Sequence, residues 1–258
     1  MSIDTDTSQP RSVREIYSAG VQALIHPGWA EDFPWLVQGT TTRGAPGREL
    51  DLGLFSGGSP ESVVHKNWGR LLAVTAMTAA VHARQVHEAE VRYHGPSRAG
   101  LRLVESCDGH ATDQAGILLT VSVADCVPIF LVTPESRMVA VLHAGWRGAA
   151  AGILERGLEL VRARAGATVG LHVHMGPSIC GSCYEVGPEV FAALGQRVPR
   201  GPSPIDLRRV LAGRALAAGV FPRHLTVSSH CTRCTESGLF SHRGGDLGRQ
   251  VAYVGVRP

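Results

Sequence analysis

The chain has 258 residues, of which 44% are hydrophobic and 18% charged, a balance that is ordinary for a globular protein and sufficient for one large core. Its net charge is only +3 and its basic residues are scattered, which argues against nucleic acid or an anionic membrane as a partner. Lys66 is the only lysine, so the chain has no Walker A phosphate loop, and a Schiff-base mechanism would have to use this residue.

The amino terminus is polar, and we expect residues 1–15 to be disordered and residues 16–258 to form a single domain. It has no apolar leader, and no segment approaches the 18 or so uninterrupted apolar residues of a membrane span. We therefore expect a cytoplasmic protein whose six cysteines are reduced.

The predicted elements alternate between strands and helices without a regular βαβ repeat. Residues 16–25 fit either a strand or a helix. Strands are predicted over residues 35–39, 81–91, 117–123, 129–133, 138–142, 169–175, 225–227 and 251–256. Helices are predicted from Ser59-Pro60-Glu61 to about Val74, after Arg147, from Gly187-Pro188-Glu189, and from an Asp206 cap to about Ala218. This order predicts an α+β domain with mixed β-sheets covered by helices.

Three of these strands, between residues 116 and 148, carry Cys126 after the first strand and His143 at the end of the third. Together with His87 they form a His/Cys trio of the kind that binds catalytic zinc and leaves a fourth position open. The same residues also fit a cysteine nucleophile with a histidine base. Because the chain has 12 histidines and six cysteines, spacing alone does not select this trio.

Several motifs nevertheless occur in an order that resembles one family. They are Thr41-Thr42-Arg43-Gly44, Gln85-Val86-His87, Cys107-Asp108-Gly109-His110-Ala111-Thr112, Ala124-Asp125-Cys126-Val127-Pro128, His143-Ala144-Gly145-Trp146-Arg147-Gly148, Gly176-Pro177-Ser178-Ile179 with Tyr184-Glu185-Val186-Gly187, and Cys231-Thr232 with Phe240-Ser241-His242-Arg243 and Gly248-Arg249. Over roughly residues 36 to 256 the chain resembles the YfiH family, also called the multicopper polyphenol oxidase (laccase-like) and peptidoglycan-editing-factor family.

The resemblance implies that His87, Cys126 and His143 are catalytic and bind zinc, or copper, in a pocket that also takes nucleosides. It implies a layered α+β sandwich and a purine nucleoside phosphorylase acting on adenosine, inosine and methylthioadenosine, with adenosine deaminase activity. Its partners would be a small purine nucleoside and phosphate, in a monomer or homodimer. Zinc activation of water accounts for deamination. Phosphorolysis depends more on positioning phosphate and protonating the purine.

Arginines in three motifs are candidates for holding phosphate, because a guanidinium binds such oxyanions in a bidentate way. Arg147 and Arg243 are predicted to be catalytic and Arg43 to bind substrate. Gln85, two residues before His87, and Asn67 are further substrate-binding candidates. The sequence departs from the family pattern at Asn67-Trp68, where Asn-Arg is usual, at Leu50-Asp51-Leu52-Gly53, and in the shortened segment 243–249.

The other clusters have plainer interpretations. Cys180/Cys183 and Cys231/Cys234 form two CxxC pairs, but 47 residues separate them, more than the roughly 15–20 of a zinc ribbon. We interpret them as packing or redox-inert thiols, with a zinc site as the alternative. His172 and His174 share a strand face but have no obvious third ligand, and Asp125 either orients a ligand histidine or caps a turn.

Three alternatives remain open. A His₂Cys site also binds copper, which would suit phenol oxidation, although multicopper electron storage needs more histidines than these motifs provide. Cys126 could instead be the nucleophile of a hydrolase that edits a peptidoglycan precursor. A metal-stabilised binding protein without turnover is the third, and closed four-ligand coordination would favour it.

Overall fold

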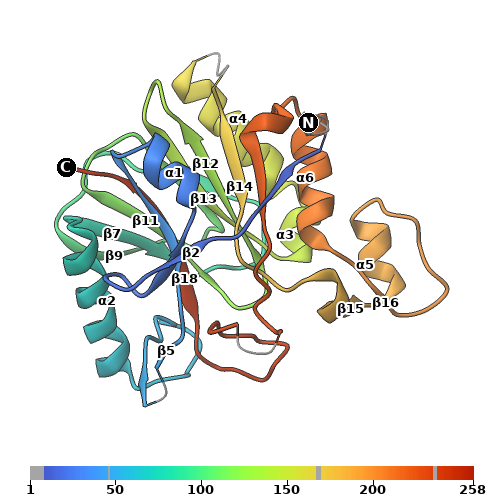
Figure 1. Ribbon diagram of the computed structural model, residues 1–258, viewed down its shortest axis with the longest axis horizontal. Helices are drawn as coiled ribbons and strands as arrows, with labels where there is room; N and C mark the ends of the chain where they lie inside the picture. The colour runs from blue at the N-terminus through green and yellow to red at the C-terminus, as the bar shows by residue number, and fades with distance from the viewer. Residues whose placement is uncertain (1–8, 46, 167–169, 235–236) are drawn as a thin grey trace, which may run out of the picture.

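A computed structural model describes residues 9–45, 47–166, 170–234 and 237–258. In this part of the chain two seven-stranded sheets pack face to face, with helices on both outer faces (Figure 1). The prediction of an α+β domain with mixed sheets covered by helices is therefore confirmed. None of the helices in these residues has the length and apolar character that crossing a bilayer requires.

The first sheet has the strand order β1-β17-β14-β12-β13-β10-β8. Its strands are β1 (Arg11–Val13), β8 (Val91–Tyr93), β10 (Gly109–Thr112), β12 (Val127–Thr133), β13 (Met138–Ala144), β14 (His172–Met175) and β17 (Leu225–Ser228). β12 and β13 form an antiparallel hairpin at its centre, whereas β14 and β17 run parallel, so the sheet is mixed.

The second sheet has the order β2-β3-β4-β18-β11-β7-β9. Its strands are β2 (Ile16–Ser18), β3 (Ala23–Ile25), β4 (Leu36–Thr41), β7 (Ala79–Ala83), β9 (Gly100–Val104), β11 (Ile117–Val123) and β18 (Gln250–Val256). β11 lies antiparallel to β18 and parallel to β7. β11 therefore lies in one sheet and β12, the next strand, in the other.

Helices cover the outer faces, and short ribbons lie at the periphery. The α-helices are α1 (Pro27–Asp32), α2 (Glu61–Thr75), α3 (Trp146–Ala150), α4 (Ile153–Ala165), α5 (Pro188–Ala193) and α6 (Leu207–Ala217). Two 3₁₀ turns, η1 (Gly181–Cys183) and η2 (Pro222–His224), and the ribbons β5 (Gly44–Ala45) with β6 (Arg48–Glu49) and β15 (Glu185–Val186) with β16 (Ser203–Pro204) complete the chain.

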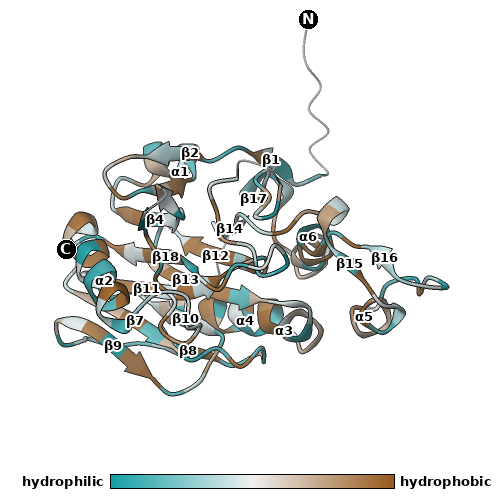
Figure 2. Ribbon diagram, turned by 90° about the horizontal axis from the view of Figure 1, so that it is seen from below, coloured by the Kyte–Doolittle hydropathy of each residue, from teal (hydrophilic) through white to brown (hydrophobic). Residues whose placement is uncertain are grey.

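Alternation along the strands explains the layers. Phe130 and Val132 of β12 point into the core between the sheets, whereas Ile129 and Leu131 point outward under α4 and α6. On the second sheet, Trp68 and other apolar residues of α2 cover the outer face. Hydrophobic and hydrophilic colours both appear on α2 and α4 in Figure 2, as expected for helices with one buried face.

Three local predictions were wrong. The predicted disorder of residues 1–15 fails at Arg11–Val13, which pairs with β17, while residues 1–8 lie outside the described part. The strand predicted over 81–91 ends at Ala83, and His87 follows in a loop with a φ of 61°. The N-cap of α2 is Pro60 instead of Ser59, without a side-chain hydrogen bond. Residues 16–25, left undecided above, form β2 and β3.

Candidate metal centre and active-site cavity

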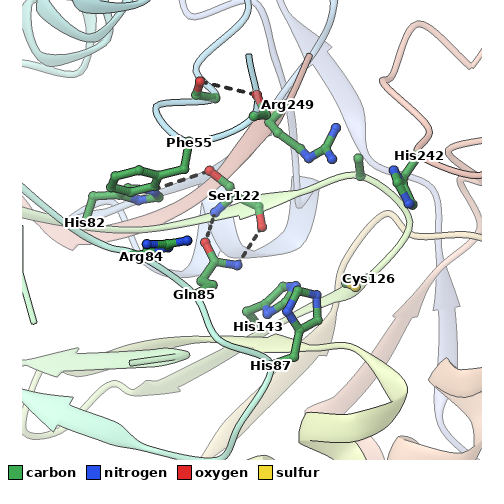
Figure 3. A pocket seen from close by; sticks show the side chains of 13 residues that line it. Phe55, His82, Arg84, Gln85, His87, Ser122, Cys126, His143, His242 and Arg249 are labelled. Atoms are coloured by element: carbon green, nitrogen blue, oxygen red, sulfur yellow. Dashed lines mark hydrogen bonds between the residues drawn. The ribbon is translucent and has the colours of Figure 1, made fainter. Parts of the chain in front are cut away.

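His87, Cys126 and His143 meet where the chain crosses from the second sheet to the first. Cys126 occupies the short turn between β11 and β12, which Asp125 makes with a φ of 87°. His143, near the end of β13, lies opposite Pro128 of β12, so its imidazole reaches the same turn. His87 arrives from the loop after β7, and its ring centroid lies 4.9 Å from that of His143 (Figure 3). The three predicted ligands thus come together.

One buried carboxylate fixes both histidines. Asp108 accepts hydrogen bonds from the backbone N–H groups of Val86, His87 and Glu88, at 3.0, 3.0 and 3.1 Å. Its Oδ1 also lies 2.9 Å from Nδ1 of His143. Because Nδ1 is engaged there, Nε2 of His143 is the nitrogen left to bind a metal. Sequence reasoning quoted Asp108 in a motif but did not identify it as a site residue.

The donor set fits a metal ion. One potential ligand atom from each of His87, Cys126 and His143 lies within 4.8 Å of the others. Zinc at its usual bond lengths would hold such atoms roughly 3.3–3.8 Å apart, so small movements complete the site. Gly145 leaves room for the trio, since a Cβ there would lie 3.1 Å from Sγ of Cys126 and 3.2 Å from Cδ2 of His87.

Electrostatics in the metal-free protein favour a thiolate. Burial raises the pKa of Cys126, but the neighbouring His143 and His87 outweigh it and lower the pKa to about 6. Burial likewise lowers the pKa of His143, but Cys126 and Asp108 raise it to about 9. The thiolate is the form of cysteine that binds metals and attacks electrophiles.

The trio borders a cavity of about 400 Å³. In Figure 3, Phe55 and Arg249 lie in the upper part of the view, Arg84 lies at the left near Gln85, and His242 lies above and to the right of Cys126. The lining residues are Gly53, Phe55, Ser56, His82, Arg84, Gln85, His87, Ser122, Ala124, Cys126, His143, His242 and Arg249. The exposed Phe55 ring stacks over His82 with 6.3 Å between ring centroids. Sequence reasoning missed Phe55, His82 and Arg84 altogether, and it placed His242 and Arg249 only inside motifs.

Gln85 lines the cavity, whereas Asn67 does not lie on its described wall. The Gln85 amide donates to the Ser122 carbonyl at 2.8 Å and accepts from the Ser122 N–H at 2.7 Å, so it ties the loop after β7 to β11. Asn67, on α2, donates to the carbonyl of Asp51 at 2.9 Å.

The three predicted arginines also lie outside the described cavity lining. Arg43 pairs with Asp246 and donates to the Leu239 carbonyl at 3.3 Å. Arg147 is exposed on α3, with its guanidinium 4.3 Å from the Trp146 ring centroid.

Arg243 donates to the Glu185 carbonyl at 2.9 Å, and its guanidinium lies 5.2 Å from the Tyr184 ring centroid. Burial raises the pKa of Tyr184 to about 12, with a contribution from Cys126, while Arg243 and Arg147 oppose the rise. The Arg243 guanidinium therefore lies beside Tyr184 and away from the described cavity lining.

The Asp125 carboxylate connects the Cys126 turn to the segments around Thr232 and Ser241. In the described structure it makes no hydrogen bond to His87 or His143. Its Oδ1 accepts from the hydroxyls of Thr232 and Ser241 at 2.5 and 2.8 Å, and Oδ2 accepts from the Arg243 N–H at 2.6 Å. The segment that carries His242 and Arg243 is thereby anchored beside Cys126.

The remaining histidine pair has its own partners. His174 lies 2.9 Å from Glu15, and His172 stacks on His224 with 4.2 Å between ring centroids. Both histidines thus have partners within the protein, which agrees with the interpretation that His172 and His174 do not form a metal site.

Comparison with known proteins gives the same architecture. Residues 37–257 match a family model described as multi-copper polyphenol oxidoreductase laccase. YlmD of Geobacillus stearothermophilus, named a purine nucleoside phosphorylase, is 36% identical over 89% of this chain and 95% of its own length. The crystal structure of YlmD from that organism superposes with a TM-score of 0.85 and 32% identity, covering 96% of this chain and 100% of that chain.

Two further relatives agree. RL5, named an adenosine deaminase and from an unknown prokaryotic organism, is 39% identical over 59% of this chain and 63% of its own length. The crystal structure of the hypothetical protein YfiH of Bacillus licheniformis has a TM-score of 0.82 at 25% identity, covering 92% of this chain and 97% of that chain. The chain therefore belongs to the YfiH family, whose family model is described as multi-copper polyphenol oxidoreductase laccase.

Proposed function

We propose that this protein is a metal-dependent purine nucleoside phosphorylase for adenosine, inosine and methylthioadenosine that also deaminates adenosine. The observation that carries the proposal is that His87, Cys126 and His143, which together could hold a metal ion, lie at the edge of a cavity of about 400 Å³ that is also lined by an exposed aromatic ring and two arginines. The names of YlmD, a purine nucleoside phosphorylase, and RL5, an adenosine deaminase, support the two activities.

The cavity lining suits a nucleoside and phosphate. The Phe55 ring is 55% exposed and offers a flat face for a purine base. Arg84 and Arg249 also line the cavity, and their guanidiniums are suited to phosphate oxygens. Arg249 is held in place by bonds from its Nη1 to the carbonyls of Asp246, Leu247 and Gly248, at 3.2, 3.0 and 2.8 Å. We therefore assign phosphate binding to Arg84 and Arg249, with Arg147 and Arg243 as the second candidates.

The reactions make separate demands on the site. In phosphorolysis the bond between the purine and C1′ of the ribose breaks, a phosphate oxygen bonds to C1′, and the purine keeps the electron pair and gains a proton. We assign that proton to His242, an exposed imidazole on the cavity wall. Deamination replaces the 6-amino group of adenosine with oxygen from water and releases ammonia. A zinc ion on His87, Cys126 and His143 would supply Lewis acidity. Asp108 keeps His143 oriented for either reaction.

The test measures hypoxanthine release from inosine by the purified protein with and without phosphate, together with ammonia release from adenosine. Release that depends on phosphate and is lost in Cys126→Ala supports the proposal. Cys107→Ala is the matched control, because Cys107 is a fully buried thiol outside the trio. Full activity in folded Cys126→Ala would overturn the proposed centre, and hypoxanthine release independent of phosphate would overturn phosphorolysis.

Copper-dependent phenol oxidation is the second candidate, favoured by the description of the family model. Among the described residues, the candidate metal-binding group that contains histidine consists of His87, Cys126 and His143. Two histidines and one cysteine are too few ligands for the several copper ions of a multicopper oxidase. Oxidation of a phenol that appears only after copper loading, in protein that does not cleave inosine, would support this candidate over the first.

A further inference from the structure

The two CxxC pairs, although 47 residues apart in sequence, come together in space. One sulfur each from Cys180, Cys183, Cys231 and Cys234 lies within 4.8 Å of the other three. Cys180 is the N-cap of η1 and Cys183 is the last residue of that turn, while Cys231 forms an isolated parallel bridge with Ser178. The spacing argument against a zinc site therefore does not apply, because the intervening residues form separate elements of the first sheet and its helices.

Two of the sulfur–sulfur distances match those of a tetrahedral thiolate site, and all four sulfurs lie within 4.8 Å of one another. Sγ of Cys234 lies 3.9 Å from Sγ of Cys180 and 3.9 Å from Sγ of Cys183. Four sulfurs around zinc, at bonds of about 2.3 Å, are roughly 3.8 Å apart. A disulfide would instead need a separation of about 2.05 Å. All four cysteines are unpaired in the structure.

The surroundings suit a bound cation better than simple packing of thiols. Only Cys231 is buried, Cys180 and Cys183 are half-buried, and Cys234 is exposed, whereas a cysteine that serves only packing is usually buried among apolar groups. The N–H of Cys180 donates to Sγ of Cys231 at 3.2 Å, which stabilises negative charge on that sulfur. The Arg233 guanidinium donates to the Cys183 carbonyl at 3.2 Å and adds positive charge beside the cluster.

We propose that Cys180, Cys183, Cys231 and Cys234 bind a structural zinc ion that is separate from the active-site metal. With four protein ligands the coordination is closed, so the role is to join two loops. Thr232, next to Cys231, donates to Asp125, and the Ile179 N–H donates to the Asp125 carbonyl at 3.0 Å. The zinc therefore braces the turn that carries Cys126 and the segment that carries His242.

The experiment measures zinc per chain by elemental analysis in full-length protein purified under reducing conditions with excess zinc and then desalted. We expect about two zinc ions per chain. Cys126→Ala should keep one, as should Cys234→Ser, chosen because Cys234 is exposed and its loss disturbs no core. In Cys126→Ala, cobalt in place of zinc should give the absorption bands of a tetrahedral cobalt–thiolate centre. Cys107→Ala, which removes a thiol outside both groups, should keep both ions.

The outcomes separate this site from the proposed activity. If Cys126→Ala retains no zinc and four of its thiols react freely in the native state, the second site does not exist. Disulfides among the four cysteines in reduced preparations, or iron bound instead of zinc, would also overturn the proposal. Loss of the active-site metal with retention of the thiolate-bound zinc would leave the structural site standing even if inosine is not a substrate.

Discussion

Asp108→Asn tests whether one carboxylate organises the metal centre. Asp108 is fully buried, accepts three backbone N–H bonds from the loop that carries His87, and lies 2.9 Å from Nδ1 of His143. Asparagine has nearly the same shape but replaces one acceptor oxygen with an N–H₂ group that faces donors. We expect zinc affinity to fall about 10- to 100-fold, which corresponds to about 1.4–2.7 kcal/mol. The free energy of unfolding should fall by about 3 kcal/mol.

Glu15→Gln is a matched control for this change. Glu15 and His174 form another buried carboxylate–imidazole pair, also at 2.9 Å, and neither belongs to the residues that line the cavity. Glu15→Gln should lower stability without changing zinc affinity at the trio. Affinity is measured by competition with a chromogenic chelator, using cobalt spectra to separate the trio from the cysteine cluster, and stability by urea denaturation. If Asp108→Asn binds zinc at the trio as tightly as the unchanged protein, Asp108 does not position the ligands.

Three other substitutions and one pH profile probe the site and its frame. Gly145→Ala should weaken metal binding at the trio, because its Cβ would lie 3.1 Å from Sγ of Cys126, whereas Gly213→Ala on α6, with open space around it, should leave binding unchanged in the same titration. Phe55→Ala should raise the KM for inosine about 5- to 150-fold in steady-state assays while the KM for phosphate stays constant, since stacking of a base on an aromatic ring contributes about 1–3 kcal/mol. His242→Asn should lower kcat for inosine phosphorolysis with little change in either KM, and an unchanged kcat would remove His242 as proton donor. Burial raises the pKa of Glu15, but hydrogen bonds from His174 and Ser228 outweigh burial and lower the pKa below 4.5. The ionised Glu15 carboxylate therefore stabilises the fold above about pH 4.5, and this stabilisation is lost as the pH falls through the pKa of the folded state. Melting temperatures below pH 5 should therefore depend less on pH in Glu15→Gln than in the unchanged protein.

Much of the frame was predictable, because its strands are hydrophobic runs bounded by turn residues. Ile117–Val123 was predicted with its observed bounds, and β12, β13 and β18 within one or two residues at each end. Such strands are buried on both faces and read as continuous apolar segments. The Asp206 cap was also predictable, since its side chain accepts from the N–H of Arg208, at 3.1 Å, as in ordinary helix N-caps.

The region around His87 was not predictable from pattern. The run from Val81 to Val91 alternates like a strand, yet it ends at Ala83 because Asp108, some 20 residues later, captures the N–H groups that a strand partner would use. A carboxylate that binds backbone leaves no periodic signal in sequence. The same is true of the cavity wall, where Phe55 comes from a loop of glycines and serines and stacks on His82 of β7.

The sequence spacing of the two CxxC pairs argued against a shared zinc site, and this argument fails for a related reason. Sequence separation limits a metal site only when the intervening residues form a single short loop. Here α5, α6 and β17 fill the interval between Cys183 and Cys231, and β14 and β17 are parallel neighbours. The loops that follow two parallel neighbours leave the sheet at the same edge, so the two cysteine pairs meet however long the connection.

The strained backbone at the trio indicates that the centre is formed by the fold before a metal arrives. His87 and Asp125 both adopt positive φ, at 61° and 87°, which costs non-glycine residues about 1–3 kcal/mol each. The His87 conformation is held by hydrogen bonds to Asp108, and the turn at Asp125 by hydrogen bonds to its own carboxylate from Thr232, Ser241 and Arg243. Each set consists of charge-assisted bonds worth about 1.5–3 kcal/mol apiece, which is enough to offset the strain without help from a metal. A metal that enters this site would therefore need to shift two imidazoles and a thiol only slightly.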